Sequence, residues 1–209
     1  MAKLPMVRAD GESILMAARI VKRGGIVVYP TDTVYGLGCD PFNEEAVRRL
    51  FKVKRRSDKA LPVLALNLKN AERIARFSEE ARKVAQRFWP GGLTLVLPKK
   101  EALPSIVTVG LKSVAVRVPS HPVALKLIDL CGGLLIGTSA NVSGNEPSAT
   151  AQEAQKRLGG AVDTILDGGA ATLMKPSTIL DLTQGVPNVL REGALPAAKI
   201  LKFLSELKK

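Results

Sequence analysis

The amino-acid sequence predicts one α/β domain in which the strands of a mixed sheet are layered with helices. Short β-branched runs alternate irregularly with segments whose apolar residues recur at helical spacing, which is typical of a layered α/β fold. Hydrophobic residues make up 46% of the chain and charged residues 24%, as in ordinary globular proteins. No stretch rich in proline, glycine or serine divides the 209 residues, so we expect a single domain over residues 1–209.

The first part of the chain is expected to form a helix, a strand, a loop and a second helix. Residues 13–23 carry apolar side chains at helical spacing, and a Gly-Gly pair supplies the stop. Residues 26–29 form a β-branched run that ends at a proline, and residues 31–38 are interpreted as a loop with two glycine hinges. The next helix covers residues 44–54, because its acidic start and basic end complement the helix dipole.

The middle of the chain predicts two strands separated by helices. Residues 61–66 predict a strand. Because proline cannot donate a backbone hydrogen bond, Pro62 indicates either an edge strand or the start of the strand. Helical patterns at about 70–76 and 79–88 lead to a Trp-Pro-Gly-Gly turn and to a strand over residues 93–97.

The last part of the chain continues the alternation of strands and helices. Residues 113–118 alternate in hydropathy and stop at a proline, a helix is expected near 122–130, and a strand over 134–136 precedes a string of small polar residues at 137–144. Further strands are expected at about 162–166, 178–182 and 188–191.

The net charge predicts an anionic partner. The chain has 31 Lys and Arg against 19 Asp and Glu, which gives +12 with the single histidine neutral. Such an excess attracts a nucleotide, an RNA or a phosphate-rich surface. The composition excludes a disordered or collagen-like chain, and no apolar run approaches the roughly 18 residues of a membrane span. The amino terminus lacks the apolar block of a signal peptide, so a cytoplasmic protein without a membrane partner is expected.

Several familiar catalytic devices are absent from the sequence. It has no Gly-x-x-x-x-Gly-Lys-Ser/Thr loop, and residues 36–41 lack the third glycine of a dinucleotide fingerprint. Cys39 and Cys131 have no zinc-ligand spacing and are interpreted as packing residues, and His121 as a capping or packing residue. Any reaction must therefore depend mainly on positioning and positive charge.

Three segments could carry such chemistry. Residues 30–38 follow a strand and offer hydroxyls and amides to a small polar ligand, although an ordinary turn uses the same residue types. Residues 54–59 concentrate cations where a helix ends, and could cover a triphosphate, whereas Arg48, Arg49 and Lys52 are interpreted as a solvated helix face. Arg117 lies in an apolar strand and needs either a ligand anion or a structural ion pair.

Six ordered blocks of the sequence together resemble the YrdC family of threonylcarbamoyl-AMP synthases. The blocks are YPTDTVYGLG at 29–38, KRRSDK at 54–59, WPGGLT at 89–94, VAVRVP at 114–119, SAN at 139–141 and KPST at 175–178. The match extends from about residue 11 to about residue 200 and resembles the stand-alone form of the family. The sequence departs from the usual pattern at Ser57, Ala60, Ala65 and Lys175.

The resemblance implies a fold, a reaction and partners. The fold would be a twisted open mixed sheet with flanking helices and a basic concave surface. The reaction would convert L-threonine, bicarbonate and ATP into L-threonylcarbamoyladenylate and pyrophosphate, the first step toward N6-threonylcarbamoyladenosine at position 37 of tRNA. Mg²⁺ would be held mainly by the nucleotide. Threonylcarbamoyl-transferase proteins would act downstream, and tRNA is a possible further partner.

The resemblance also implies roles for individual residues. Lys54, Arg56 and Arg117 would serve catalysis, the first two as a mobile basic pair over the nucleotide. The implied threonine-binding residues are Thr31, Thr33, Arg117, Gly137 and Ser177. The implied ATP-binding residues are Lys54, Arg56, Ser113, Ser139, Asn141, Ser148 and Arg191.

Two alternatives of other classes stay open at this point. A basic concave face could make the chain an RNA-binding module for tRNA or double-stranded RNA, with affinity that depends strongly on salt. A carbamoyl-transfer activity on another acceptor is the third reading, because a YrdC-like domain also occurs in hydrogenase-maturation carbamoyltransferases. The sequence lacks the acylphosphatase and zinc-finger segments that accompany that domain.

Overall fold

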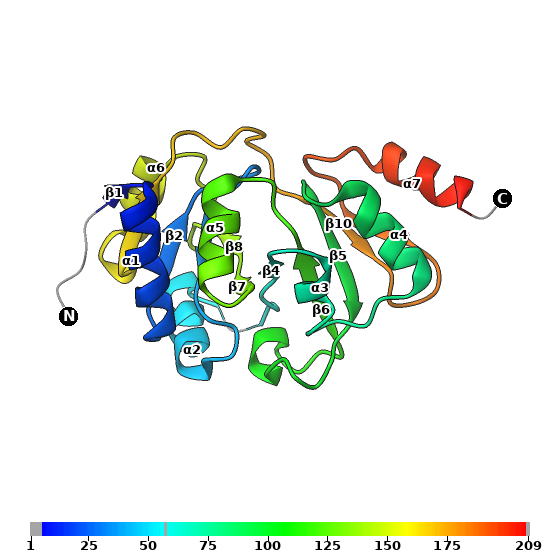
Figure 1. Cartoon of the computed structure of the whole chain (residues 1–209), viewed down its shortest axis with the longest axis horizontal. Coiled ribbons are helices and arrows are strands. Elements are labelled where there is room, and N and C mark those ends of the chain that lie inside the picture. Colours follow the sequence, from blue (N-terminus) through cyan, green and yellow to red (C-terminus); the bar gives the residue numbers. More distant parts are fainter. Residues whose placement is uncertain (1–5, 57, 208–209) are drawn as a thin grey trace.

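The computed structural model describes residues 6–56 and 58–207, which form an elongated α/β molecule with β1 and α7 at opposite ends of its long axis (Figure 1). The helices are α1 (Gly11–Lys22), α2 (Glu44–Lys54), α3 (Leu68–Ala71), α4 (Glu79–Phe88), α5 (Pro122–Leu130), α6 (Ala151–Leu158) and α7 (Ala197–Glu206), with short 3-10 turns η1 (Ser105–Thr108) and η2 (Gly159–Ala161). The strands are β1 (Met6–Arg8), β2 (Val27–Tyr29), β3 (Gly36–Gly38), β4 (Val63–Ala65), β5 (Leu93–Pro98), β6 (Ser113–Arg117), β7 (Leu134–Ile136), β8 (Thr138–Ser139), β9 (Thr164–Asp167), β10 (Thr178–Asp181) and β11 (Asn188–Arg191).

The strands form two mixed sheets. One has the order β1-β9-β2-β3-β8 and the other β11-β10-β5-β6-β4-β7. Each contains parallel and antiparallel pairs, such as β2 with β9 and β2 with β3 in the first, or β5 with β10 and β5 with β6 in the second. The predicted α/β class with mixed strands and flanking helices is confirmed. The strands are divided between two sheets, whereas the sequence predicted one.

The chain passes from the second sheet to the first at Gly137, between β7 and β8. A Cβ atom at this position would lie 2.3 Å from Cγ of Leu64, so a larger residue would fit only if the Leu64 side chain moved. The two sheets are also tied together where the Tyr29 hydroxyl donates to the Ile136 carbonyl over 2.8 Å. Residues of both sheets share one large apolar cluster, in which Val28 and Leu37 accompany Leu95 and Val116.

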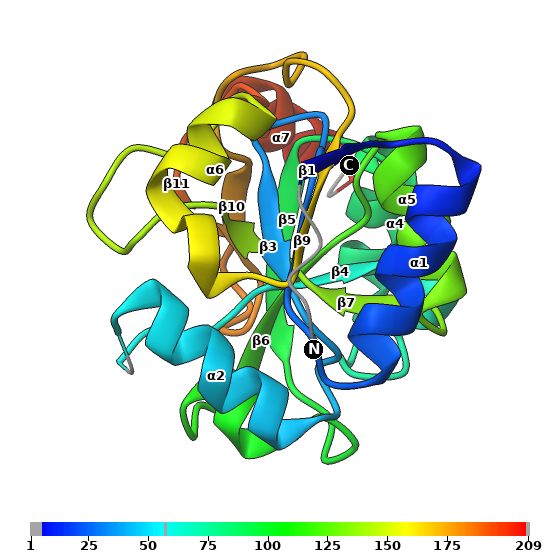
Figure 2. The ribbon, with the colours of Figure 1, turned by 90° about the vertical axis from the view of Figure 1, so that its left-hand side faces the viewer.

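Helices cover the outer faces of both sheets. Helices α1 and α5 lie side by side in both views (Figures 1 and 2) and bury Ile14, Leu127 and Ile128 in a second apolar cluster. At the other end of the molecule, the Phe88 ring of α4 meets the Phe203 ring of α7 edge-on at 5.6 Å. The prediction of a single domain over residues 1–209 stays a proposal. No helix of the described residues is long and apolar enough to cross a membrane.

The structure confirms most predicted elements, corrects two of them and adds others. Residues 36–38, expected in a loop, form β3, because they pair with β2 on one side and β8 on the other. The helix expected at 70–76 is α3, which already ends at Ala71. Beyond it the Arg76 amide donates to the carbonyl of Pro98, the last residue of β5, so this segment lies against the strand. Strands β1 and β8 and helices α6 and α7 were not predicted. Cys39 is buried in the core, where burial raises the pKa of its thiol to about 12, in agreement with a packing role.

Candidate functional site

A polar cavity of about 320 Å³ opens between the two sheets. Its walls come from the β2–β3 loop, the loop after α2, strands β4, β5, β6, β8 and β10, and the end of β11. Four cationic residues line it, namely Arg56, Lys59, Arg117 and Arg191, and no carboxylate among the described residues does so. The cavity therefore suits a ligand that carries several negative charges.

The β2–β3 loop presents two threonine hydroxyls to the cavity. The Thr31 hydroxyl donates to the Val34 carbonyl over 2.6 Å and accepts from the Thr33 amide at 3.2 Å, which closes a tight turn. The two hydroxyl oxygens lie 3.0 Å apart, and both side chains line the cavity. Since the Thr31 hydroxyl donates to Val34, the Thr33 hydroxyl is the donor between the two threonines.

Arg117, at the end of β6, is fixed from three sides. Its Nε donates to the Gly91 carbonyl over 2.8 Å and its Nη1 to the Thr33 hydroxyl over 2.7 Å, while Nη2 forms an ion pair with Asp32. The residue is only 5% exposed, and burial lowers its pKa, which the Asp32 charge opposes. A guanidinium has five N–H groups, and these bonds engage three of them, so donors remain for a ligand.

Arg117 forms a structural ion pair with Asp32, which is one of the two partners expected from the sequence. Asp32 Oδ1 also accepts from the Ser120 amide at 3.2 Å, and the Asp32 carbonyl accepts from the Leu173 amide at 2.8 Å. Asp32 therefore joins the arginine to the segment that leads into β10. Its Oδ2 atom is buried and has no hydrogen-bond partner among the described residues.

The opposite wall is built from β5, β10 and β11. The Ser177 hydroxyl lies 2.7 Å from the Thr94 hydroxyl, and both residues line the cavity. Arg191 Nη2 donates to the Ser177 carbonyl over 2.7 Å, which places the guanidinium at the rim. Partial burial lowers the pKa of Arg191.

Lys54 is the last residue of α2 and is buried, whereas the resemblance implied a mobile basic residue over the nucleotide. Only 1% of the residue is exposed. Its ammonium donates to the Ser139 carbonyl over 2.7 Å and to Asn141 Oδ1 over 2.9 Å. Asn141 Oδ1 also accepts from the Ser139 hydroxyl at 2.6 Å. Lys54 thus holds the β8 end in place from behind the cavity wall.

Arg56 reaches the cavity from this side, as does Lys59 of the same loop. It follows Arg55, which ends α2 in the left-handed region at φ 51°. Arg56 Nη1 donates to the Ser143 hydroxyl over 3.1 Å, and its buried Nε has no partner among the described residues. Burial lowers the pKa of Arg56, and nearby Asp58 opposes the shift. Ser57, one of the departures from the family pattern, lies outside the described residues.

The structure brings most of the twelve predicted site residues to one place. Those that line the cavity are Thr31, Thr33, Arg56, Arg117, Gly137, Ser139, Ser177 and Arg191. Lys54, Asn141 and Ser148 lie behind its wall, where the Ser148 hydroxyl donates to the Ala140 carbonyl over 2.6 Å. Ser113 begins β6 on the same face as Ala115 and Arg117, since side chains of a strand alternate.

Sequence reasoning missed Asp32, Thr94 and Lys59 as individual members of the site. All three lie inside the six blocks, but a threonine or an aspartate in a turn has many ordinary uses. The signal that could have found Asp32 is the need of Arg117 for a counter-charge. His121 is the residue before α5, and its side chain makes no capping bond.

The burial of Lys54 predicts how stability depends on pH. Burial, followed by the charge of Arg56, lowers the pKa of Lys54 from 10.5 to about 7. Between these values the unfolded chain binds more protons than the folded chain, so the free energy of unfolding is expected to rise with pH. Lys54→Met is expected to remove this contribution. Urea unfolding of both proteins between about pH 6 and 10 measures it, and identical profiles would contradict the prediction.

Fold and site together define a class of protein. It is an α/β protein with a cavity at the junction of two mixed sheets, lined by serine and threonine hydroxyls and by four cationic side chains. Residues 19–193 match the family model Sua5_yciO_yrdC, described as "Telomere recombination", and the chain belongs to this family.

Known relatives resemble the chain over most of its length. It is 41% identical over 203 residues to the threonylcarbamoyl-AMP synthase of Pyrococcus abyssi, covering 96% of this chain and 60% of that protein. It is 38% identical over 190 residues to the synthase of Bacillus subtilis, covering 90% and 55%. The crystal structure of P. abyssi Sua5 complexed with L-threonine superposes with a TM-score of 0.91 at 40% identity, covering 95% of this chain and 60% of that one. The chain therefore spans less than two thirds of the length of these relatives.

Proposed function

We propose that the protein is an ATP-dependent synthase that forms L-threonylcarbamoyladenylate from L-threonine, bicarbonate and ATP, with release of pyrophosphate. The proposal depends mainly on one observation about the cavity. It contains the neighbouring Thr31 and Thr33 hydroxyls, the second of which accepts a hydrogen bond from Arg117, together with three further cationic side chains. The names of the relatives and the threonine complex of the P. abyssi protein support the same substrates.

The threonine subsite is proposed around Arg117. The remaining guanidinium N–H groups would hold the threonine carboxylate, with the Thr33 and Ser177 hydroxyls beside it. Gly137 lines the same wall, and its lack of a side chain lets Leu64 pack against the backbone there.

The nucleotide subsite is proposed on the side of Arg56, Lys59 and Arg191. Their positive charge would offset the triphosphate, and the Ser139 hydroxyl would add a neutral donor. Lys54 and Asn141 would act from behind by holding Ser139. Ser113 and Ser148 are proposed as further nucleotide contacts.

The proposed reaction has two bond-forming steps. The threonine amine attacks the carbon of bicarbonate, and loss of water gives a carbamate. A carbamate oxygen then attacks the α-phosphorus of ATP, the bond to the β-phosphate oxygen breaks, and pyrophosphate leaves. The cavity contributes by keeping the reacting groups together and by excluding water, since a carbamate decomposes readily in solution. The cations contribute by stabilising the charge that develops on the leaving pyrophosphate.

Mg²⁺ would enter with ATP as part of the substrate. The described residues contain no group of three or more His, Cys, Asp or Glu that could hold a metal ion, and no carboxylate of theirs lines the cavity. A resident metal site built from protein side chains therefore does not fit, and no step above is assigned to one. Threonylcarbamoyl-transferase proteins would consume the adenylate, and tRNA would be their substrate.

Omission of one substrate at a time tests the proposed function. Purified protein is incubated with ATP and bicarbonate, with or without L-threonine, and the adenylate product and pyrophosphate are measured by mass spectrometry and a coupled assay. We expect both products only in the complete mixture, because the carbamate that attacks ATP is made from threonine. Equal pyrophosphate release without threonine would contradict the proposal.

A further inference from the structure

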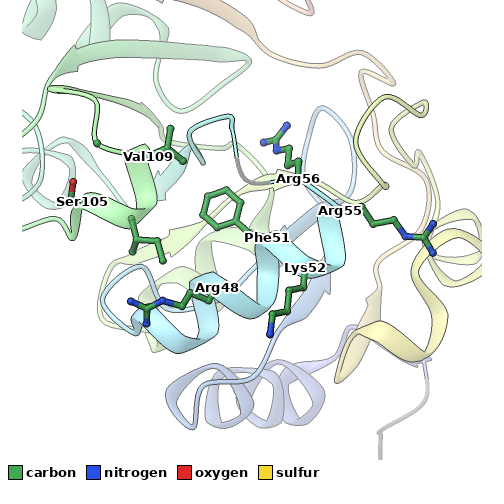
Figure 3. Close-up of a pocket in the computed structure, with 9 residues that line it drawn as sticks. Arg48, Phe51, Lys52, Arg55, Arg56, Ser105 and Val109 are labelled. Atoms are coloured by element: carbon green, nitrogen blue, oxygen red, sulfur yellow. The ribbon is translucent and has the colours of Figure 1, made fainter.

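A second, larger hollow lies outside the proposed active site. This groove, of about 770 Å³, runs between α2 and η1 and is called the α2–η1 groove (Figure 3). Its lining residues are Arg48, Phe51, Lys52, Arg55, Arg56, Ser105, Ile106, Val109 and Gly110. Arg56 lines both hollows, so the groove adjoins the mouth of the polar cavity. None of the proposed steps uses the other eight residues.

The floor of the groove is apolar. Phe51 lies between Arg48 and Arg56 in Figure 3 and is 8% exposed, with Ile106 and Val109 partly buried beside it. Leu111, which follows the groove residue Gly110 in the chain, is 53% exposed. An apolar floor next to an exposed leucine is a surface that can bury the apolar side chains of a partner.

The rim of the groove is cationic. Arg48, Lys52, Arg55 and Arg56 line it, and no carboxylate of the described residues does. Arg48 is paired with Glu44, but both side chains are more than half exposed, at 60% and 52%. Replacing Glu44 with a carboxylate of a partner would therefore cost little free energy. The rim therefore carries an excess of positive charge, which is complementary to acidic side chains that flank an apolar segment.

Backbone strain marks both sides of the same groove. Arg55 and Val109 have positive φ values of 51° and 47°. Residues other than glycine seldom adopt this region, and a β-branched residue such as valine is especially unfavourable there. Strained positions that retain a side chain concentrate at functional surfaces.

We propose that the α2–η1 groove docks a segment of a partner protein in which apolar side chains alternate with carboxylates. The apolar residues would cover Phe51, Ile106 and Val109, and the carboxylates would pair with Arg48 and Lys52. A nucleic acid fits less well. Single-stranded bases bind by stacking on open aromatic faces, whereas Phe51 is almost covered and the rest of the floor is aliphatic.

Charge reversal at matched places tests the location of binding. The probe is a fluorescein-labelled synthetic peptide of alternating leucine and glutamate, and binding is followed by fluorescence anisotropy. The double variant Arg48→Glu with Lys52→Glu is compared with Arg19→Glu with Lys22→Glu, which changes the same charge on exposed residues of α1. We expect about a tenfold or greater loss of affinity in the first variant and little change in the second. Equal losses would show diffuse attraction to a basic protein and overturn the proposal.

Two further binding measurements, one with a variant protein and one with a different peptide, test the apolar part of the proposal. Val109→Gly removes an apolar wall at a position whose φ glycine accepts, so the variant is expected to fold and to bind the peptide more weakly. A peptide of glutamate alone is expected to bind weakly to the unchanged protein. Equal affinity for both peptides, or absence of binding, would overturn the proposal.

A single-stranded RNA tests the alternative occupant of the groove. The proposal would also be overturned if the RNA bound more tightly than the peptide and lost affinity in the Arg48 and Lys52 variant. Adenylate formation is expected to persist in every variant, which separates this test from that of the proposed function.

Discussion

Arg117→Ala is expected to raise the KM for threonine by about a hundredfold or more, because truncating one partner of a buried charged pair costs several kcal/mol. Arg117 is 5% exposed, and its guanidinium is held by Gly91, Thr33 and Asp32. It is the proposed anchor of the threonine carboxylate. Steady-state pyrophosphate release at varied threonine concentration measures the effect, and the KM for ATP is expected to change much less.

Two controls keep the Arg117 prediction interpretable. Arg117→Lys retains the charge but loses the planar fork, so it is expected to fold more readily than the alanine variant and still bind threonine poorly. Circular dichroism reports whether each variant is folded. The affinity of each variant for tRNA separates the alternatives, since an RNA-binding surface at Arg117 would lose RNA affinity instead. A folded variant with an unchanged KM for threonine would remove Arg117 from the proposed subsite.

Asp32→Ala is expected to destabilise the protein by about 3–5 kcal/mol, because it leaves the buried Arg117 charge without its partner. The Asp32 and Arg117 side chains are 8% and 6% exposed, and the Ser120 amide loses an acceptor as well. Urea unfolding measures the difference in the free energy of unfolding.

The matched control for Asp32 is Glu44→Ala. It removes the carboxylate of an exposed ion pair with Arg48, whose side chains are 52% and 60% exposed. Exposed pairs contribute about 0–1 kcal/mol, so this variant is expected to unfold at nearly the same urea concentration as the unchanged protein. Equal losses in the two variants would contradict the assignment of Asp32 as the structural partner of Arg117.

The residues around Arg117 show how far sequence could predict the site. An arginine in an apolar strand indicates a need for an anion, and the structure supplies Asp32 from a loop 85 positions earlier. Sequence spacing does not specify such a distant pairing, so the ion pair and the ligand anion stayed open as alternatives. Lys54 illustrates the reverse case. Its place at a helix end suggested mobility, whereas packing against Ser139 and Asn141 buries it.

The fold shows the same division between local and distant information. Helix α2 begins where Asn43 accepts from the Ala46 amide, and its acidic start and basic end were visible in the sequence. The separation into two sheets was not visible in the sequence, because it depends on which distant strands pair. Strand β7 pairs with β4, and β8, one residue later, pairs with β3. Gly137 permits this change of sheet, but a single glycine among small polar residues does not predict that the chain passes from one sheet to another.

A crystal structure with L-threonine and a non-hydrolysable ATP analogue tests the central claim most directly. The account predicts the threonine carboxylate on Arg117 beside Thr33, and the phosphates against Arg56 and Arg191 in the same cavity. Threonine or nucleotide bound elsewhere, with this cavity left unaltered, would contradict it.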